Sequence, residues 1–279
     1  MNKIKYINKN SIFIQSSINE FFLTELQNYA YPIEFIGFNE SEFGTEDFKI
    51  LNEYFKKNKN VVLRFVEKGY LEHFPDLENI EYGKTEFDNS MFDELKHLKN
   101  LNSIDFRTLG GKLDISPLIE YKNTLKGLAF EGDLTKNGEE IISQLSNLKK
   151  VAFISSKFKS FEFLSDLKLE IFKYYGSRTI NYEDLVRIKS LKYFWLKTNT
   201  KWDNFDFLSE LENIETIELH YVSGIQEFPK CSHLKNLKRV ISFDCNNLTN
   251  IDELKKLSNC YVHAYGKKIE NKFYQHNGS

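Results

Sequence analysis

The chain has 279 residues, a formal net charge of −2, and 41% apolar, 28% charged and 15% aromatic residues. A nearly neutral chain has no overall attraction for nucleic acid or for an anionic membrane, so electrostatic recognition must be local. No stretch reaches the roughly 20 apolar residues of a membrane helix, and the N-terminal segment matches a secretory signal poorly. Three cysteines at no metal-ligand spacing, Cys231, Cys245 and Cys260, are typical of a reducing compartment. We therefore expect a cytoplasmic protein with no membrane attachment.

The first 65 residues alternate between helix and strand signals. Ser17 to Glu20 has the capping-box pattern that opens helices, and Thr45 is placed to cap a second helix. The apolar segments that follow are typical of strands. The predicted elements are a helix over 17–29, a strand over 33–38, a helix over 45–57 and a strand over 61–65.

From residue 77 onwards, apolar residues return at regular intervals. In six-residue windows the first, fourth and sixth positions are mostly apolar, and the windows start 24, 24, 23, 21, 22, 23, 23 and 23 residues apart. Apolar residues at every third position before most windows indicate a short helix or 3₁₀ turn, and the fourth and sixth positions alternate as in a strand. Each unit is therefore a helical turn plus a short strand, which must stack on its neighbours to bury its apolar edge. The windows are Leu77-Ile80-Tyr82, Leu101-Ile104-Phe106, Leu125-Leu128-Phe130, Leu148-Val151-Phe153, Leu169-Phe172-Tyr174, Leu191-Phe194-Leu196, Ile214-Ile217-Leu219, Leu237-Val240-Ser242 and Cys260-His263-Tyr265.

These repeats resemble the leucine-rich repeat family, with Phe and Tyr often replacing Leu in its LxxLxL core. The best unit is LKRVISFDCNNLTNIDELKKL, residues 237–257, and Asp114 to Leu118 resembles the DISPL punctuation of bacterial internalin-type repeats. The resemblance implies an α/β solenoid with a parallel β-sheet on its concave face and short helices or 3₁₀ turns on its convex face. The position that is usually asparagine varies here, which leaves the turn geometry and the curvature uneven.

We predict three regions in this solenoid. Residues 1–60 form a divergent N-terminal cap with longer helices, continuous with the repeats; a separate N-terminal domain is the alternative. Residues 61–269 form the leucine-rich repeats, and residues 270–279 form a C-terminal tail. The last strand leaves an open edge that either this tail or another copy of the protein could cover.

Motifs for catalysis or for cofactor binding are missing from the sequence. It contains no glycine-rich phosphate loop, no GxSxG, no HExxH and no CxxC. His73 and His97 fall between strands, where solvated or capping roles are expected, and His263 is expected at an inward position of the last unit, as a core or capping histidine. Gly110-Gly111 indicates a turn. We therefore expect no catalytic residue, no metal site and no cofactor, and predict that the chain is not an enzyme.

The third, fifth and seventh window positions are predicted to project from the concave face of the sheet. The early repeats place small and mostly acidic residues there, and the later repeats place aromatic and basic residues. Large aromatics on a solvated face are typical of binding anchors, although stacking along the sheet is an alternative explanation. The strand at Ile241 and Phe243 could also be slipped by one residue. The predicted partner-binding residues are Glu81, Asp105, Arg107, Glu131, Lys173, Tyr175, Tyr193, Trp195, Lys197, His220, Tyr221, Arg239 and Phe243.

The predicted function is a non-enzymatic module that binds another folded protein through the concave face. The family resemblance implies receptors, adhesins, scaffolds or inhibitors, and an unsecreted chain without an added effector domain is similar to an inhibitor or immunity protein that occludes a toxin or enzyme. The Lys-, Asn-, Ile- and Phe-rich composition resembles that of proteins from low-GC bacteria. The alternative is glycan or single-stranded nucleic-acid binding on the aromatic and basic later repeats. The partner and the oligomeric state remain open.

Overall fold

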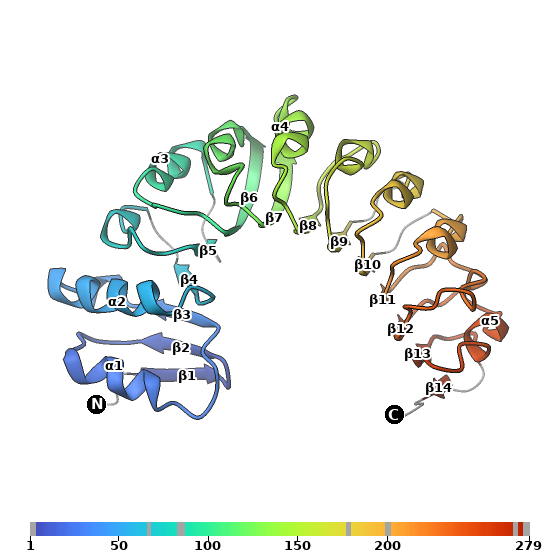
Figure 1. Cartoon of the computed structure of the whole chain (residues 1–279), viewed down its shortest axis with the longest axis horizontal. Helices are drawn as coiled ribbons and strands as arrows, with labels where there is room; N and C mark the ends of the chain where they lie inside the picture. The colour runs from blue at the N-terminus through green and yellow to red at the C-terminus, as the bar shows by residue number, and fades with distance from the viewer. Residues whose placement is uncertain are drawn as a thin grey trace. The chain divides into compact units, whose positions relative to one another are not determined.

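The computed structural model describes residues 4–65, 68–82, 87–176, 180–198, 202–269 and 273–275. Fourteen strands in this part of the chain are hydrogen-bonded in the order of the sequence, from β1 to β14 (Figure 1). The chain folds as two compact units, Met1–Phe130 and Glu131–Ser279, called unit 1 and unit 2 below. The long run of mostly parallel strands with short helical connections confirms the predicted leucine-rich-repeat fold.

Unit 1 contains a two-strand hairpin, three parallel strands with the longer helices, and the first regular repeats. β1 pairs with β2 antiparallel, whereas the pairs from β2 to β6 are parallel. The elements are β1 Ile4–Asn8, β2 Ser11–Ile14, α1 Glu20–Gln27, β3 Phe35–Phe38, η1 Glu40–Glu42, α2 Thr45–Lys57, β4 Val62–Phe65, η2 Leu71–His73, β5 Asn79–Tyr82, η3 Asn89–Met91, α3 Phe92–Leu95, β6 Ser103–Leu113, η4 Ser116–Tyr121 and the start of β7 Gly127–Leu134.

Helix α2 ends at Lys57 as predicted, but its N-cap is Gly44, and the predicted cap Thr45 is its first residue. The N-cap of α1 is Asn19, two residues after the predicted cap Ser17. The reason is Asp47 in the first turn of α2, whose carboxylate accepts hydrogen bonds from the Ser17 hydroxyl at 2.9 Å and the Ile18 amide at 2.6 Å. Ser17 is therefore tied to α2 and does not cap α1. The assignment of residues 1–60 as a cap stays a prediction.

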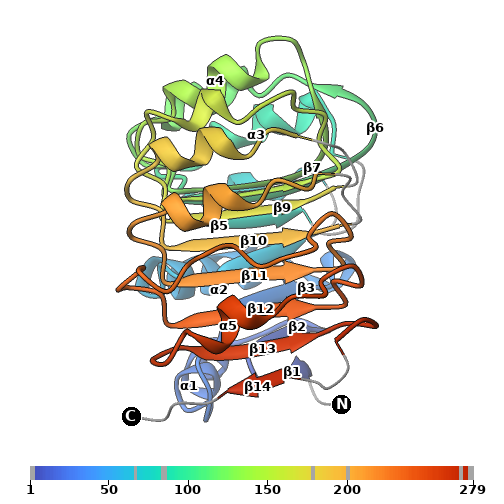
Figure 2. The same cartoon turned by 90° about the vertical axis from the view of Figure 1, so that its right-hand side faces the viewer.

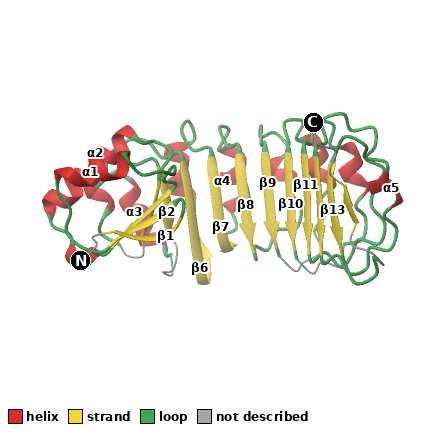
Figure 3. Cartoon of the chain, turned by 90° about the horizontal axis from the view of Figure 1, so that it is seen from below, coloured by secondary structure: helices red, strands yellow, loops and turns green. Residues whose placement is uncertain are grey.

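Unit 2 consists of regular repeats that end in one antiparallel strand. In unit 2 the helical turns lie on one side of the strands (Figure 2), and the strands β8 to β13 pair in parallel and run in one direction (Figure 3). The elements are the end of β7, α4 Gly138–Gln144, β8 Lys150–Ile154, η5 Glu162–Leu164, β9 Ile171–Tyr175, η6 Glu183–Arg187, β10 Tyr193–Lys197, η7 Asp206–Glu210, β11 Thr216–His220, β12 Arg239–Phe243, α5 Asp252–Lys255, β13 Tyr261–Tyr265 and β14 Phe273–Gln275.

The core of unit 2 is filled by the inward residues of the strands and by rings from the connections. Phe172, Phe194 and Ile217 lie side by side in register and are fully buried. The Phe161 ring comes from the connection before β9, and its centre lies 4.8 Å from that of Phe172 and 5.6 Å from that of Tyr182. These contacts between repeats are what an isolated repeat lacks, so each repeat depends on its neighbours.

The internalin-like punctuation corresponds to a local hydrogen bond that opens a helical turn. Asp114 accepts a hydrogen bond from the backbone amide of Ser116 at 3.0 Å, and this orients the chain into η4. The same bond to the residue two positions later recurs at Asp88, Asn181, Asn204 and Asn250.

Three expectations about strands are corrected. His263 is not in the core: Val262 and Ala264 point inward in register with Val240 and Ser242, so His263 and Tyr265 point outward. The expected turn at Gly110-Gly111 lies inside β6, where Gly111 takes φ +77°. The possible slip at β12 does not occur, since Val240 and Ser242 are both buried.

The tail closes the open end of the sheet. β14, which lies in the predicted tail, pairs antiparallel with β13, and the Gln275 side chain donates a hydrogen bond to the Leu257 carbonyl at 2.8 Å. Of the two possibilities for the last edge, the chain's own tail therefore covers it.

Candidate functional site

The outward side chains of β8 to β13 form one continuous surface, called here the open face of unit 2. Each strand contributes its first, third and fifth residues, because the second and fourth are buried. The parallel register aligns these residues in three rows across the strands. The rows are Lys150, Ile171, Tyr193, Thr216, Arg239 and Tyr261; Ala152, Lys173, Trp195, Glu218, Ile241 and His263; and Ile154, Tyr175, Lys197, His220, Phe243 and Tyr265.

Exposed tyrosines concentrate on this face. Among the described residues of unit 2, the exposed large apolar side chains are Tyr175 at 42%, Tyr221 at 45%, Tyr265 at 44% and Tyr274 at 55%. Tyr274 on β14 pairs opposite the outward residue His263, so it belongs to the same face. Tyr221 directly follows β11, and its ring lies against Phe243 of the face. The open face and its margin therefore carry all the exposed large apolar side chains described in unit 2.

Cationic side chains lie over several of these rings. The Lys197 ammonium is 5.0 Å from the centre of the Tyr175 ring and 6.0 Å from that of the Tyr221 ring. Lys173 lies 5.4 Å from the Tyr193 ring centre, and the Arg239 guanidinium 5.5 Å from the Tyr261 ring centre. Such cation–π contacts hold long, otherwise mobile side chains in place on the surface.

Glu218 is the one carboxylate among the outward strand positions, and its neighbours surround it. Its side chain is only 13% exposed, and its oxygens lie 3.6 Å from Nε of Arg239 and 3.5 Å from Nε2 of His220. The Tyr193 hydroxyl donates a hydrogen bond to it, and burial together with this carboxylate raises the pKa of Tyr193 to about 12. Burial lowers the pKa of the His220 imidazole, whereas Glu218 opposes this shift.

Tyr221 follows β11 in an unusual backbone conformation. Its φ is 59°, in the left-handed region that bulky residues rarely adopt. The residues at the same point of two other repeats, Ser155 and Asp244, also have positive φ, so the turn itself requires this conformation. A tyrosine here adds backbone strain, and its ring contacts Phe243 on the open face at 5.6 Å.

The structure brings together the nine predicted residues of the later repeats. Trp195 and Tyr193 are half-buried on the open face, and the Trp195 ring lies 5.9 Å from that of His220. Their binding role stays a prediction. Strand alternation places Glu218 outward, although it is not among the predicted binding residues. Sequence reasoning missed Lys150, Tyr261, Tyr265 and Tyr274, of which the alternation could have shown Lys150. The nine residues are Lys173, Tyr175, Tyr193, Trp195, Lys197, His220, Tyr221, Arg239 and Phe243.

The four predicted residues of the early repeats lie outside the strands β8 to β13. Glu81 accepts a hydrogen bond from Arg64 at 2.8 Å, a partner that sequence reasoning missed, so its charge is neutralised within unit 1. Asp105 lies beside Glu81 in register, and Arg107 is exposed further along β6. Glu131, on β7, is half-buried.

The described residues offer few features for chemistry. They contain no group of three or more His, Cys, Asp or Glu side chains placed to hold a metal ion. The three cysteines are buried and unpaired, and burial raises the pKa of Cys231 to about 12 and that of Cys260 to about 11, which keeps these thiols protonated. No helix in the described ranges is long and apolar enough to cross a membrane.

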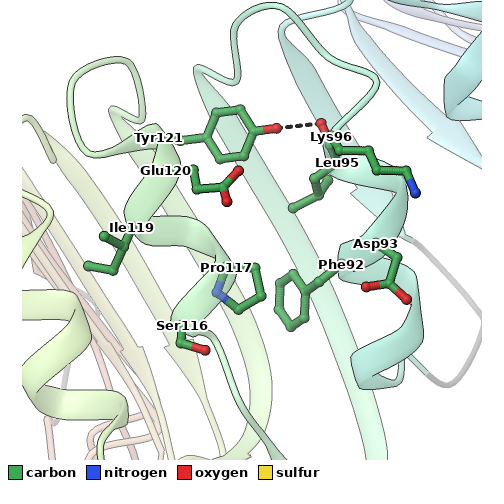
Figure 4. A pocket seen from close by; sticks show the side chains of 9 residues that line it. All are labelled: Phe92, Asp93, Leu95, Lys96, Ser116, Pro117, Ile119, Glu120 and Tyr121. Atoms are coloured by element: carbon green, nitrogen blue, oxygen red, sulfur yellow. Dashed lines mark hydrogen bonds between the residues drawn. The ribbon is translucent and has the colours of Figure 1, made fainter.

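A hollow of about 560 Å³ lies on the helical side of unit 1, between α3 and η4 (Figure 4). Its lining mixes apolar side chains such as Phe92 and Pro117 with Asp93, Lys96 and Glu120, and the Tyr121 hydroxyl donates to the Leu95 carbonyl beside it. It is wide open and brings no set of convergent catalytic groups together. The open face of unit 2 is therefore the stronger candidate site.

The sequence matches no protein-family model and no curated protein. Among solved structures, an internalin of Listeria monocytogenes is similar at 14% identity and a TM-score of 0.46, covering 91% of this chain and 86% of that one. A leucine-rich repeat protein of Leptospira interrogans is similar at 19% identity and a TM-score of 0.49, covering 77% and 57%. The chain's own repeat length and strand order identify the leucine-rich-repeat fold, with repeats that resemble the internalin type.

Proposed function

We propose that the chain is a non-enzymatic module that binds another protein through the open face of unit 2. The observation that carries the proposal is the cluster of exposed tyrosines Tyr175, Tyr221, Tyr265 and Tyr274 on one face of the sheet. Packing of the core does not require these rings, and exposed apolar surface favours association. Tyrosine supplies a large, rigid contact area at low entropy cost, which is why it is enriched in protein interfaces.

Nucleic-acid binding is the weaker alternative for this face. Stacking of unpaired bases needs free ring faces, but Lys173, Lys197 and Arg239 already lie over the rings of Tyr193, Tyr175 and Tyr261. The cations therefore cover the rings on which bases would stack, and they do not form a separate row of positive charge beside those rings, as binding of a nucleic-acid backbone would require.

Site-specific photo-crosslinking tests the proposal. A photoreactive phenylalanine analogue replaces Tyr175 or Tyr221, and in the control it replaces Glu162, whose side chain is 72% exposed in η5 on the helical side. In native lysate we expect the two face positions to capture the same protein, and the Tyr193→Ala/Trp195→Ala background to lose it. Equal capture from Glu162, or adducts that nuclease removes, would contradict the proposal.

The finer form of this proposal is a bacterial cytoplasmic inhibitor or immunity protein that occludes a toxin or enzyme. The support for it is compositional, together with the three unpaired thiols of the described chain. Once a partner is captured, its activity should fall in proportion to added chain. A fully active partner in the saturated complex would leave the binding function standing and remove the inhibitor role.

A further inference from the structure

The open face of unit 2 has a charge opposite in sign to that of the whole chain. Its outward strand positions hold four cations, Lys150, Lys173, Lys197 and Arg239, against the single carboxylate of Glu218. With neutral histidines this is a formal +3, whereas the chain carries −2. Including the residue that follows each strand adds one further carboxylate, Asp244, and leaves +2.

The lysines of this face differ from those of the neighbouring loops. Lys149 and Lys192 each lie 3.7 Å from Glu170, and Lys238 lies 2.7 Å from Glu215. In contrast, Lys173 and Lys197 form no ion pair within the described residues, and their ammonium groups rest against tyrosine rings. Their charge is therefore available to a partner, whereas that of the loop lysines is already paired.

The one carboxylate of the face presents little charge to a partner. Glu218 is 13% exposed and is enclosed by Tyr193, His220 and Arg239. Its contacts orient the side chains of Tyr193, His220 and Arg239. The surface that remains accessible is thus cationic and aromatic, with the cations already positioned by the rings.

We propose that the open face of unit 2 recognises an acidic protein surface, whose carboxylates pair with Lys173, Lys197 and the half-exposed guanidinium of Arg239, which faces Glu218 through Nε, while its apolar groups pack on the exposed tyrosines. This inference rests on the proposed function and specifies its partner class. Neighbouring strands lie about 4.8 Å apart, so the cations of β9 to β12 span about 14 Å. A few acidic residues on one helix or strand of a partner cover that distance.

The test uses Trp195 as a reporter on the face itself. The chain has two tryptophans, so Trp202→Phe leaves Trp195 as the single tryptophan, whose emission can be excited selectively over that of the tyrosines. This protein is titrated with poly-L-glutamate and, separately, with a single-stranded oligothymidylate, at about 50 mM and about 500 mM salt. Two variants with the same loss of three positive charges are compared: Lys173→Gln/Lys197→Gln/Arg239→Gln on the face, and Lys149→Gln/Lys192→Gln/Lys238→Gln on the loops.

We expect poly-L-glutamate to change the Trp195 emission, and the face variant to weaken its binding by roughly tenfold or more while the loop variant changes it less than about twofold. Equal weakening by the two variants overturns the proposal, because it would show general charge attraction only. Tighter binding of oligothymidylate also overturns it. If poly-L-glutamate does not bind but photo-crosslinking from Tyr175 and Tyr221 persists, the acidic partner class fails and the protein-binding function stands.

Discussion

The Lys197 ammonium of β10 lies 5.0 Å from the centre of the Tyr175 ring of β9. A cation over an aromatic ring at an exposed site contributes about 0.5–1 kcal/mol, enough to restrict a lysine that would otherwise sample many rotamers. The lysine is therefore ordered before a partner arrives, and binding loses less side-chain entropy. The same arrangement at Lys173 and Tyr193 indicates that preorganisation is a general feature of this face.

Replacement of Tyr221 should separate stability from binding. The φ of 59° at Tyr221 strains the backbone, and Asn adopts this conformation at a lower energy cost than most other non-glycine residues. Tyr221→Asn should therefore be more stable than Tyr221→Ala by about 0.5–1 kcal/mol in urea unfolding. Both variants lose the ring and should lose the crosslinked partner equally. Equal free energies of unfolding of the two variants would show that backbone strain at this position does not affect stability.

Stability should fall at mildly acidic pH because of His220. Its ring faces Trp195, Lys197, Glu218 and Phe243, and burial lowers its pKa below the ordinary 6.5. Between the lowered pKa and 6.5 the unfolded chain binds a proton that the folded chain does not, so this contribution is complete above 6.5 and is lost as the pH falls. The free energy of unfolding should drop less between about pH 7.5 and about pH 5.5 in His220→Gln than in the unmodified chain.

The exposed His233 on a loop provides the control for this pH effect. It lies in the connection between β11 and β12, outside the strands that form the face, and its Nε2 atom is 2.9 Å from the carbonyl oxygen of Ser209 in η7. His233→Gln is the matched variant for the pH dependence of unfolding, because it removes an imidazole that lies outside the face. If the two variants alter the pH dependence equally, the environment of His220 is not the cause.

The face assignment of the later repeats could be predicted because strand alternation fixes which side chains point outward. Two buried residues per strand, such as Phe194 and Leu196, place Tyr193, Trp195 and Lys197 on the other side without further information. In the last unit the same rule failed. In earlier repeats the first inward strand residue comes three positions after the buried window start, as Val240 follows Leu237, but Val262 comes only two positions after the buried Cys260. A one-residue shift then exchanges the two faces.

Contacts between strands could not be predicted from the repeat pattern. The Arg64–Glu81 pair depends on the register of β4 against β5, and the enclosure of Glu218 depends on β10, β11 and β12 together. The edge strands β1 and β14 are short and carry no repeat signal. They form because their backbones hydrogen-bond to the edges of β2 and β13, which the sequence pattern does not reveal. The positive φ at Tyr221 likewise follows from the geometry of the turn, and a tyrosine in the sequence gives no sign of it, unlike a glycine or an asparagine.

The core of unit 2 should depend strongly on Phe161. This ring is fully buried and contacts Phe172, Tyr174 and Tyr182 of neighbouring repeats. Phe161→Ala should lower the free energy of unfolding by about 3–5 kcal/mol, since it removes buried area and leaves a cavity between repeats. Phe21→Ala removes the same ring from a side chain that is 77% exposed and should cost less than about 0.5 kcal/mol in urea unfolding. Similar losses in both variants would contradict this account of the core.

Removal of β14 should cause self-association. A chain that ends at Ile269 lacks the strand whose residues Phe273 and Gln275 pair with Ala264 and Val262, so the backbone groups of the β13 edge lose their partners. An unpaired edge is a template for a strand of another molecule. We expect light scattering after size exclusion to show a mass that rises with concentration relative to the full chain, with the far-UV circular dichroism retained. Tyr274→Ala controls for the loss of the exposed ring, because it keeps the strand pairing; it should behave as the full chain does. A truncated chain whose mass matches the full chain at every concentration would show that β14 does not protect the edge.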